Sequence, residues 1–181
     1  MVENISIQRN LILSENVSQT SVLNIMKSIY DINYDDDTKC KDLINFVREP
    51  IKLYINTYGG SIYDGLALIN VIQHSTTPVY TICSGSAMSM GLPILLAGSK
   101  RIAYKYSTIL YHEASTMCWD KLTTIKQDLK EVERLQSVID KMILDKTKIL
   151  KEKLDDVKDK KIDWYIPADE ALKLGIIDEI L

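Results

Sequence analysis

The 181-residue sequence is short of several features that would assign it to a specialised class of protein. Its only cysteines are Cys40, Cys83 and Cys118, and they form no Cys-x-x-Cys pair, which argues against a disulfide scaffold and a structural zinc site. Lysine and arginine number 22 against 25 acidic residues, so the net charge of −3 offers no basic surface for nucleic acid. No apolar run is long enough to cross a bilayer.

The rest of the composition is that of an ordinary globular protein. Hydrophobic residues make up 46% of the chain and charged residues 26%, and 181 residues suit one compact domain, taken as residues 1–181. The first ten residues lack the basic and then apolar pattern of a secretory signal peptide. We therefore expect a cytoplasmic protein without a membrane, nucleic-acid, metal or cofactor partner. Cys83, inside an apolar run, is predicted to be a core residue.

Apolar segments alternate with glycine-bearing breaks between Ile51 and His112. The elements predicted there are strands at 51–56, 79–83, 100–104 and 108–112, and helices at 62–73 and 89–97. A short strand within 10–17 and a helix over 18–30 are predicted upstream. Such alternation favours parallel strands joined by right-handed crossovers, which is an α/β fold.

The C-terminal part of the chain shows a different pattern. From Leu122 to about Leu150 apolar residues recur every three or four positions, which predicts one long amphipathic helix. Its apolar stripe has to be covered, and a second subunit would cover it. The segment "PADEALKLG" predicts a short helix with Pro in its first turn and Gly just after its end, and "IIDEI" predicts a closing strand. The acidic stretch 31–42 predicts an exposed loop.

The segment "GSAMSMG", residues 85–91, places Ser89 where a strand is expected to turn into a helix. In open α/β sheets, functional sites gather at such strand ends. A nucleophilic serine requires a base, a group that orients the base, and donors for the oxyanion. The N–H groups of Met90 and of Gly60, in the neighbouring break, are candidate donors. The alternative interpretation is that Ser89 is a small residue required for packing, and Ser86 is the nearest rival nucleophile.

The chain has two histidines. His112 ends a predicted strand and would face the same crevice as Ser89, whereas His74 ends a predicted helix and is expected to be exposed to solvent. Among the acidic residues, Asp163 stands out because "IDWYIPA" surrounds it with apolar neighbours. A partly buried carboxylate needs a partner, and an imidazole would serve. The alternative interpretation gives His112 and Asp163 structural roles, with the carboxylate hydrogen-bonded to backbone.

Four segments in this order, "LYINTYGGSIYDGLALINVIQ", "TICSGSAMSMG", "ILYHEA" and "IDWYIPADEALKLGIIDEIL", resemble the proteolytic subunit of the Clp protease. The resemblance extends from about Leu11 to Leu181. It implies an α/β fold of the ClpP/crotonase superfamily, with stacked ββα units and a long protruding handle helix within about 113–153. It also implies a serine endopeptidase that cleaves peptides or unfolded polypeptides inside a homo-oligomeric chamber of stacked heptameric rings, a tetradecamer.

By position in the shared motifs, the resemblance also implies residue roles. The triad it implies is Ser89 as nucleophile, His112 as general base and Asp163 as orienting acid. The oxyanion donors it implies are the N–H groups of Gly60 and Met90. The residues it implies for binding the peptide as an added β-strand are Gly60, Ser61 and Ile62, together with the segment after His112.

The chain departs from the family pattern near each of these motifs. Tyr58 stands where the family has Pro before its two glycines, which removes a rigid turn. Glu113 and Ala114 replace the Gln-Pro that follows the family's histidine, and Ile162 replaces an Arg that links ring contacts to activity. The family's glycine-rich handle strand is absent from "ASTMCWDK". Substrate binding and ring contacts are therefore expected to differ from those of the family.

The resemblance implies an AAA+ unfoldase as partner, but the expected docking positions carry Lys52, His74 and Ser84 in place of apolar or aromatic residues. A charged lysine in an apolar docking cleft lowers affinity, which argues against a standard unfoldase partner. The Lys- and Ile-rich composition resembles phage and plasmid members of the family. Three alternatives to a chambered peptidase stay open: a non-catalytic or latent ring subunit, a phage capsid-maturation protease, and a crotonase-type acyl-CoA enzyme.

Overall fold

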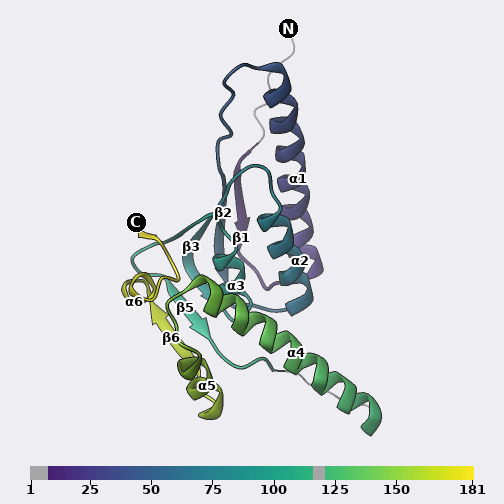
Figure 1. Ribbon diagram of the computed structural model, residues 1–181, viewed down its shortest axis with the longest axis vertical. Helices are drawn as coiled ribbons and strands as arrows, with labels where there is room; N and C mark the ends of the chain where they lie inside the picture. Colours follow the sequence, from purple (N-terminus) through teal and green to yellow (C-terminus); the bar gives the residue numbers. More distant parts are fainter. Residues whose placement is uncertain (1–7, 116–120) are drawn as a thin grey trace.

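The computed structural model describes residues 8–115 and 121–181, which form strands and helices in alternation (Figure 1). The strands are β1 (Asn10–Leu13), β2 (Ile51–Thr57), β3 (Val79–Met88), β4 (Lys100–Ala103), β5 (Thr108–Tyr111), β6 (Trp164–Pro167) and β7 (Glu179–Ile180). The helices are α1 (Gln19–Asp42), α2 (Ile62–Gln73), α3 (Gly91–Leu96), α4 (Leu122–Lys146), α5 (Lys151–Asp159) and α6 (Ala168–Lys173).

The described strands form one sheet that divides at β3. The main path runs β1-β2-β3-β4-β7, and every neighbouring pair along it is parallel. Residues 80–83 of β3 pair with β4, whereas residues 86–88 pair with β5, also in parallel. β6 pairs antiparallel with β5. The parallel pairs and their intervening helices confirm the α/β class that the alternating pattern predicted.

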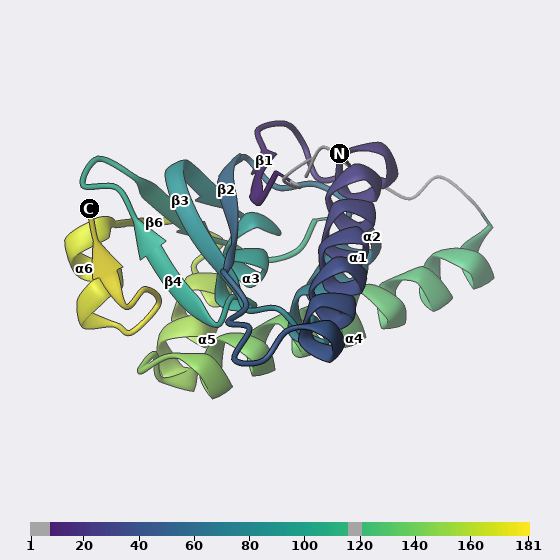
Figure 2. The ribbon, with the colours of Figure 1, turned by 90° about the horizontal axis from the view of Figure 1, so that it is seen from above.

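One face of the sheet is buried under helices. In β2, Ile51, Leu53 and Ile55 have no exposed surface, whereas Lys52 between them is exposed. This alternation is the period of a strand that packs on one face only. α1, α2 and α3 cover the buried face, and α1 runs alongside α2 (Figures 1 and 2). Cys83 lies in the core between sheet and helices, as predicted, and burial raises the pKa of its thiol to about 11.

The acidic stretch 31–42 is helical, so the prediction of an exposed loop was wrong. α1 continues through it to Asp42 because its acidic side chains find partners within the protein. Asp36 is completely buried and accepts two hydrogen bonds from Arg9, at 2.9 and 2.5 Å, and one from Thr77 at 2.6 Å. Paired in this way, the charge no longer requires solvent.

Replacing Arg9 with Met should lower the free energy of unfolding by about 3–5 kcal/mol, because Asp36 would be left buried without a counter-charge. Burial alone raises the pKa of Asp36, but the hydrogen bonds from Arg9 and Thr77 outweigh burial and hold that pKa below its usual 3.8. The stability that Asp36 contributes is therefore present above pH 3.8 and is lost as the pH falls through the lower, folded-state pKa.

Urea unfolding at a fixed protein concentration measures this loss, with Arg48→Met as the control. Arg48 pairs with Asp37 at 2.6 Å, but the Asp37 side chain is 45% exposed. Loss of such a pair costs at most about 1 kcal/mol. Equal losses in the two variants would contradict the importance of the buried pair.

The long helix predicted from Leu122 to about Leu150 is shorter than expected. α4 ends at Lys146, and a separate helix, α5, begins at Lys151. The backbone is extended at both Thr147 and Leu150, which separates the two helices. The charged segment after Leu150 is therefore a helix of its own, and neither this helix nor the strand β6 that follows it was predicted.

The apolar stripe of α4 is only partly covered. Leu135 and Ile143 are buried, whereas Leu122 and Leu129 are 68% and 54% exposed. Figure 1 shows the N-terminal half of α4 projecting away from the sheet. The segment "ASTMCWDK", which was predicted to lack the family's glycine-rich strand, falls largely outside the described residues. Cys118 also lies outside them. None of the helices in the described ranges combines the length and the apolar character needed to pass through a membrane.

Candidate active site

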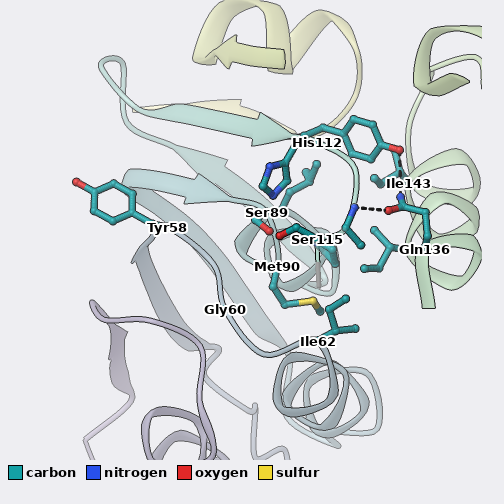
Figure 3. Close-up of a pocket in the computed structure, with 14 residues that line it drawn as sticks. Tyr58, Gly60, Ile62, Ser89, Met90, His112, Ser115, Gln136 and Ile143 are labelled. Atoms are coloured by element: carbon teal, nitrogen blue, oxygen red, sulfur yellow. Dashed lines mark hydrogen bonds between the residues drawn. The ribbon is translucent and has the colours of Figure 1, made fainter. Parts of the chain in front are cut away.

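The carboxyl ends of three parallel strands meet at one edge of the sheet. β2 ends shortly before Gly60, β3 ends before Ser89, and β5 ends before His112. Because β2 pairs with β3 and β3 with β5, all in parallel, the residues after these strands come together. Figure 3 shows all three residues around one cavity. The sequence predicted that these strand ends meet, and the structure brings the three residues together.

Ser89 has a backbone conformation that is rare for a residue with a side chain. Its φ is +52°, in the left-handed region, which costs about 1–2 kcal/mol. Two backbone hydrogen bonds hold the turn: Ser89 N donates to Leu110 O at 3.0 Å, and Leu92 N donates to Ser89 O at 3.1 Å. The chain thus turns sharply from β3 toward α3, with the half-buried Ser89 at the cavity wall. Strain of this kind is typical of functional turns.

Two glycines make room for this turn. A Cβ atom at Gly59 would lie 2.6 Å from the Cβ of Ser89 and 2.8 Å from Met88 O. A Cβ atom at Gly65, on α2, would overlap the side chain of Met90, which is buried against that helix. A side chain at Gly59 would displace the segment that carries Ser89, and one at Gly65 would displace the side chain of Met90.

The N–H of Gly60 is directed toward the cavity. Val17 N donates to Gly59 O at 2.8 Å, and Ser61 N donates to Val17 O at 2.8 Å, which makes Gly60 and Val17 a parallel bridge. In such a bridge the residue between the two bonded ones directs its own N–H and C=O to the opposite side. Gly60 lines the cavity on that side. Its N–H is therefore oriented to donate to an acceptor placed there.

His112 lies between a carboxylate and the cavity. Its Nδ1 is 3.3 Å from Oδ1 of Asp163, just before β6, the antiparallel neighbour of β5. The side chains of His112 and Asp163 are 32% and 52% exposed. Within the described residues no hydrogen bond joins His112 to Ser89, although both line the same cavity (Figure 3). The imidazole is therefore held on one side and open to the cavity on the other.

Asp163 is exposed rather than partly buried, so that prediction was wrong. The chain turns at Lys161, where φ is +51°, and Asp163 follows in an exposed position. Its apolar neighbours Ile162 and Tyr165 are themselves 44% and 56% exposed. β6 pairs with β5 alone among the described strands, so it forms an edge and part of its apolar sequence faces solvent.

The cavity has a volume of about 210 Å³, and helices supply walls that the sequence analysis did not identify. The residues missed are Tyr58, Leu92, Pro93, Tyr111, Gln136, Ile139 and Ile143. Helical spacing was the available signal for three of them, because positions 136, 139 and 143 fall on one face of α4. Tyr58 is 74% exposed, and its ring points away from Ser89 and His112 (Figure 3).

Two of the predicted peptide-binding residues have different positions relative to the cavity. Ile62 lines it, beside Gly60. Ser61 instead begins α2, where its side chain accepts a hydrogen bond from Asp64 N at 3.4 Å. Its N–H is already bonded to Val17 O. Ser61 is therefore placed to shape the turn.

Three residues replace the apolar or aromatic residues expected at the docking positions, and all three lie on the surface or near it. Lys52 is exposed on the face of β2 opposite the core. His74 is exposed at the C-terminal end of α2, as predicted. Ser84 is half-buried, and its hydroxyl donates to Ile55 O at 3.3 Å.

The fold and the strand-end cavity define an α/β protein that brings a serine, a histidine and a carboxylate to one edge of its sheet. The chain matches the family model described as Clp protease over residues 2–181. It therefore belongs to the Clp protease family, as its sequence motifs predicted.

Three relatives are named as proteolytic subunits of ATP-dependent Clp proteases. The ATP-dependent Clp protease proteolytic subunit of Deinococcus radiodurans is 36% identical over 136 residues, covering 74% of this chain and 66% of that protein. The ATP-dependent Clp protease proteolytic subunit 2 of Prochlorococcus marinus (strain MIT 9312) is 31% identical over 180 residues, covering 98% of this chain and 83% of that protein. The ATP-dependent Clp protease proteolytic subunit 3 of Synechococcus sp. (strain CC9902) is 29% identical over 180 residues, covering 98% of this chain and 84% of that protein. The chain thus spans just under two thirds of the Deinococcus protein and more of the other two.

Proposed function

We propose that the protein is a serine endopeptidase of the ClpP type, with Ser89 as nucleophile. The observation that carries the proposal is the meeting of Ser89 and His112 at one cavity, with His112 Nδ1 3.3 Å from Asp163. The strained φ of Ser89 supports it, because a residue needed only for packing would gain nothing from that strain. The names of the relatives, proteolytic subunits of Clp proteases, point to the same chemistry.

In the proposed reaction, Ser89 Oγ attacks the scissile carbonyl carbon while His112 Nε2 takes the hydroxyl proton. Asp163 keeps the other imidazole proton on Nδ1 and stabilises the imidazolium that forms. The N–H groups of Gly60 and Met90 donate to the oxyanion. His112 then gives its proton to the leaving amine. A water, deprotonated by His112, finally hydrolyses the acyl ester and regenerates the Ser89 hydroxyl.

We infer that the peptide runs in extended form past Gly60 and Ile62 and places one side chain in the cavity. A cavity of about 210 Å³ lined by Ile139 and Ile143 suits an aliphatic or aromatic side chain. Its substrates would be peptides or unfolded polypeptides, because an extended backbone is required.

We also propose that the chain assembles into stacked heptameric rings. Leu122 and Leu129 lie exposed on the projecting half of α4, and a second copy of the chain would cover them. The exposed Lys52 on the open face of the sheet weakens the case for an AAA+ unfoldase that docks through apolar loops. The cytoplasmic location expected from the sequence stays a prediction.

One alternative is favoured by a specific observation. The described residues contain no hydrogen bond between Ser89 and His112, which suits a latent or non-catalytic ring subunit. A capsid-maturation protease would use the same residues on a different substrate. A crotonase-type acyl-CoA enzyme would use the Gly60 and Met90 donors without needing Ser89.

The purified full chain should hydrolyse short fluorogenic peptides with an apolar residue before the cleaved bond. Prior reaction with a fluorophosphonate should abolish the hydrolysis, and light scattering should show a particle much heavier than the 20.6 kDa chain. An assembled particle that leaves every peptide intact would favour the non-catalytic subunit. A rise in melting temperature with coenzyme A would favour the acyl-CoA enzyme.

A further inference from the structure

A group of polar side chains ties the segment that carries His112 to α4. Gln136 Oε1 accepts a hydrogen bond from Ala114 N at 2.6 Å, and Gln136 Nε2 donates to the Tyr111 hydroxyl at 3.2 Å. Figure 3 draws both bonds as dashed lines. The bonded residues lie on either side of His112 along the chain, at positions 111 and 114. One glutamine of α4 therefore bonds the side chain of the residue before the histidine and the backbone two residues after it.

Asp140, one helical turn after Gln136, is the centre of this group. Its Oδ1 accepts hydrogen bonds from the Tyr111 hydroxyl at 2.6 Å and from Gln136 Nε2 at 2.7 Å. Its Oδ2 accepts from Lys158 Nζ, on α5, at 2.7 Å. The Asp140 side chain is 14% exposed and that of Lys158 is 23% exposed, so the pair is largely shielded from solvent. Burial beside Asp140 raises the pKa of Tyr111, which therefore stays protonated and keeps donating.

Lys158 connects the same group to Asp163. The chain between them is held tightly by Lys160 N donating to Asp156 O at 3.1 Å and Ile162 N donating to Val157 O at 3.2 Å. A shift of α5 relative to α4 would therefore move Asp163. Through Asp140, the segments that carry the histidine and the carboxylate are fixed to the same turn of α4.

We propose that Gln136, Asp140 and Lys158 are positioning residues that set the geometry between His112 and Asp163. The inference rests on the proposed peptidase function. Neither Asp140 nor Lys158 lines the cavity, so both act through Tyr111, His112 and Asp163 and not on the substrate. Displacement of a reacting group by about 1 Å costs on the order of 10²-fold in rate.

The test compares kcat and KM for one fluorogenic peptide in the full chain. Asp140→Leu removes every acceptor and should lower kcat about tenfold or more, with KM changed less than about twofold. Asp140→Asn keeps an oxygen for Tyr111 and Gln136 and should recover kcat to within about threefold of the parent protein. Asp145→Leu is the matched control, because Asp145 lies on the same helix in an exposed pair with Lys141 and should change neither constant.

Melting temperature and light scattering accompany each variant. An unchanged kcat for an assembled Asp140→Leu particle would overturn the inference, as would an equally large loss for Asp140→Asn. Should Asp140→Leu fail to assemble, Lys158→Met decides, because it cuts the tie between α4 and α5 while leaving Asp140 in place, although it also removes the 3.1 Å pair between Lys158 and Asp155 within α5. It is expected to lower kcat about threefold or more at constant KM, and an unchanged kcat would overturn the inference. A parent protein without fluorophosphonate-sensitive hydrolysis would contradict the proposed function itself.

Discussion

Ser89→Ala is expected to lower kcat for peptide hydrolysis by about 10⁴-fold or more, because the Ala methyl cannot form the acyl ester. The fold should be unaffected, since the side chain is half-buried at a cavity wall and both backbone hydrogen bonds of the turn remain. Initial rates with a fluorogenic peptide measure the effect, and light scattering confirms that the particle is intact.

Two comparisons distinguish a catalytic role of Ser89 from a general effect of replacing a serine near the cavity. Ser86→Ala should retain hydrolysis, because the Ser86 hydroxyl donates to Asn56 Oδ1 at 3.1 Å and does not line the cavity. Combining Ser89→Ala with His112→Ala should cost no more than Ser89→Ala alone, since residues that act as a unit are not additive. Hydrolysis that survives Ser89→Ala but is lost in Ser86→Ala would assign the nucleophile to Ser86 instead.

Gly60→Ala is expected to lower kcat by about 10²–10³-fold, which is the effect of losing one oxyanion donor. The φ of Gly60 is +145°, and an added Cβ would overlap Val17 O and lie 2.9 Å from Val17 N. The backbone therefore has to move, and the N–H that faces the cavity moves with it. The rate of fluorophosphonate labelling measures the same loss without a peptide substrate.

Gly175→Ala is the matched control for this prediction. Gly175 also has a positive φ, +71°, but the nearest atom to an added Cβ is 3.6 Å away. That variant carries the backbone strain without the overlap, so it should lower the melting temperature and leave kcat unchanged. Equal kcat in Gly60→Ala and the parent protein would exclude the Gly60 N–H as an oxyanion donor.

The meeting of Ser89, His112 and Gly60 was predictable from the sequence for a physical reason. Each follows an apolar segment, and the carboxyl ends of parallel strands share one edge. The alternation of strands and helices between residues 51 and 112 was strong enough to establish that the strands are parallel. The pattern therefore predicted both the class of fold and the edge where the cavity lies.

Other features depend on contacts between segments that no local pattern contains. The acidic end of α1 is helical because Arg9 and Thr77, distant in the sequence, pair with Asp36. Asp163 is exposed because β6 is an edge strand, which its apolar neighbours did not indicate. The bonds of Asp140 to Tyr111 and Lys158 span 29 and 18 residues, and no local pattern around either partner indicates a bond to Asp140.

The most direct measurement is the location of a fluorophosphonate adduct on the assembled parent protein. Trypsin should release residues 53–100 as one peptide, which also contains Ser61, Ser75, Ser84, Ser86 and Ser99, so fragmentation on both sides of position 89 is needed. We predict a single adduct on Ser89 that disappears in His112→Ala and persists in His74→Ala. An adduct on another serine, or none on an assembled particle, would contradict Ser89 as the nucleophile of a working peptidase.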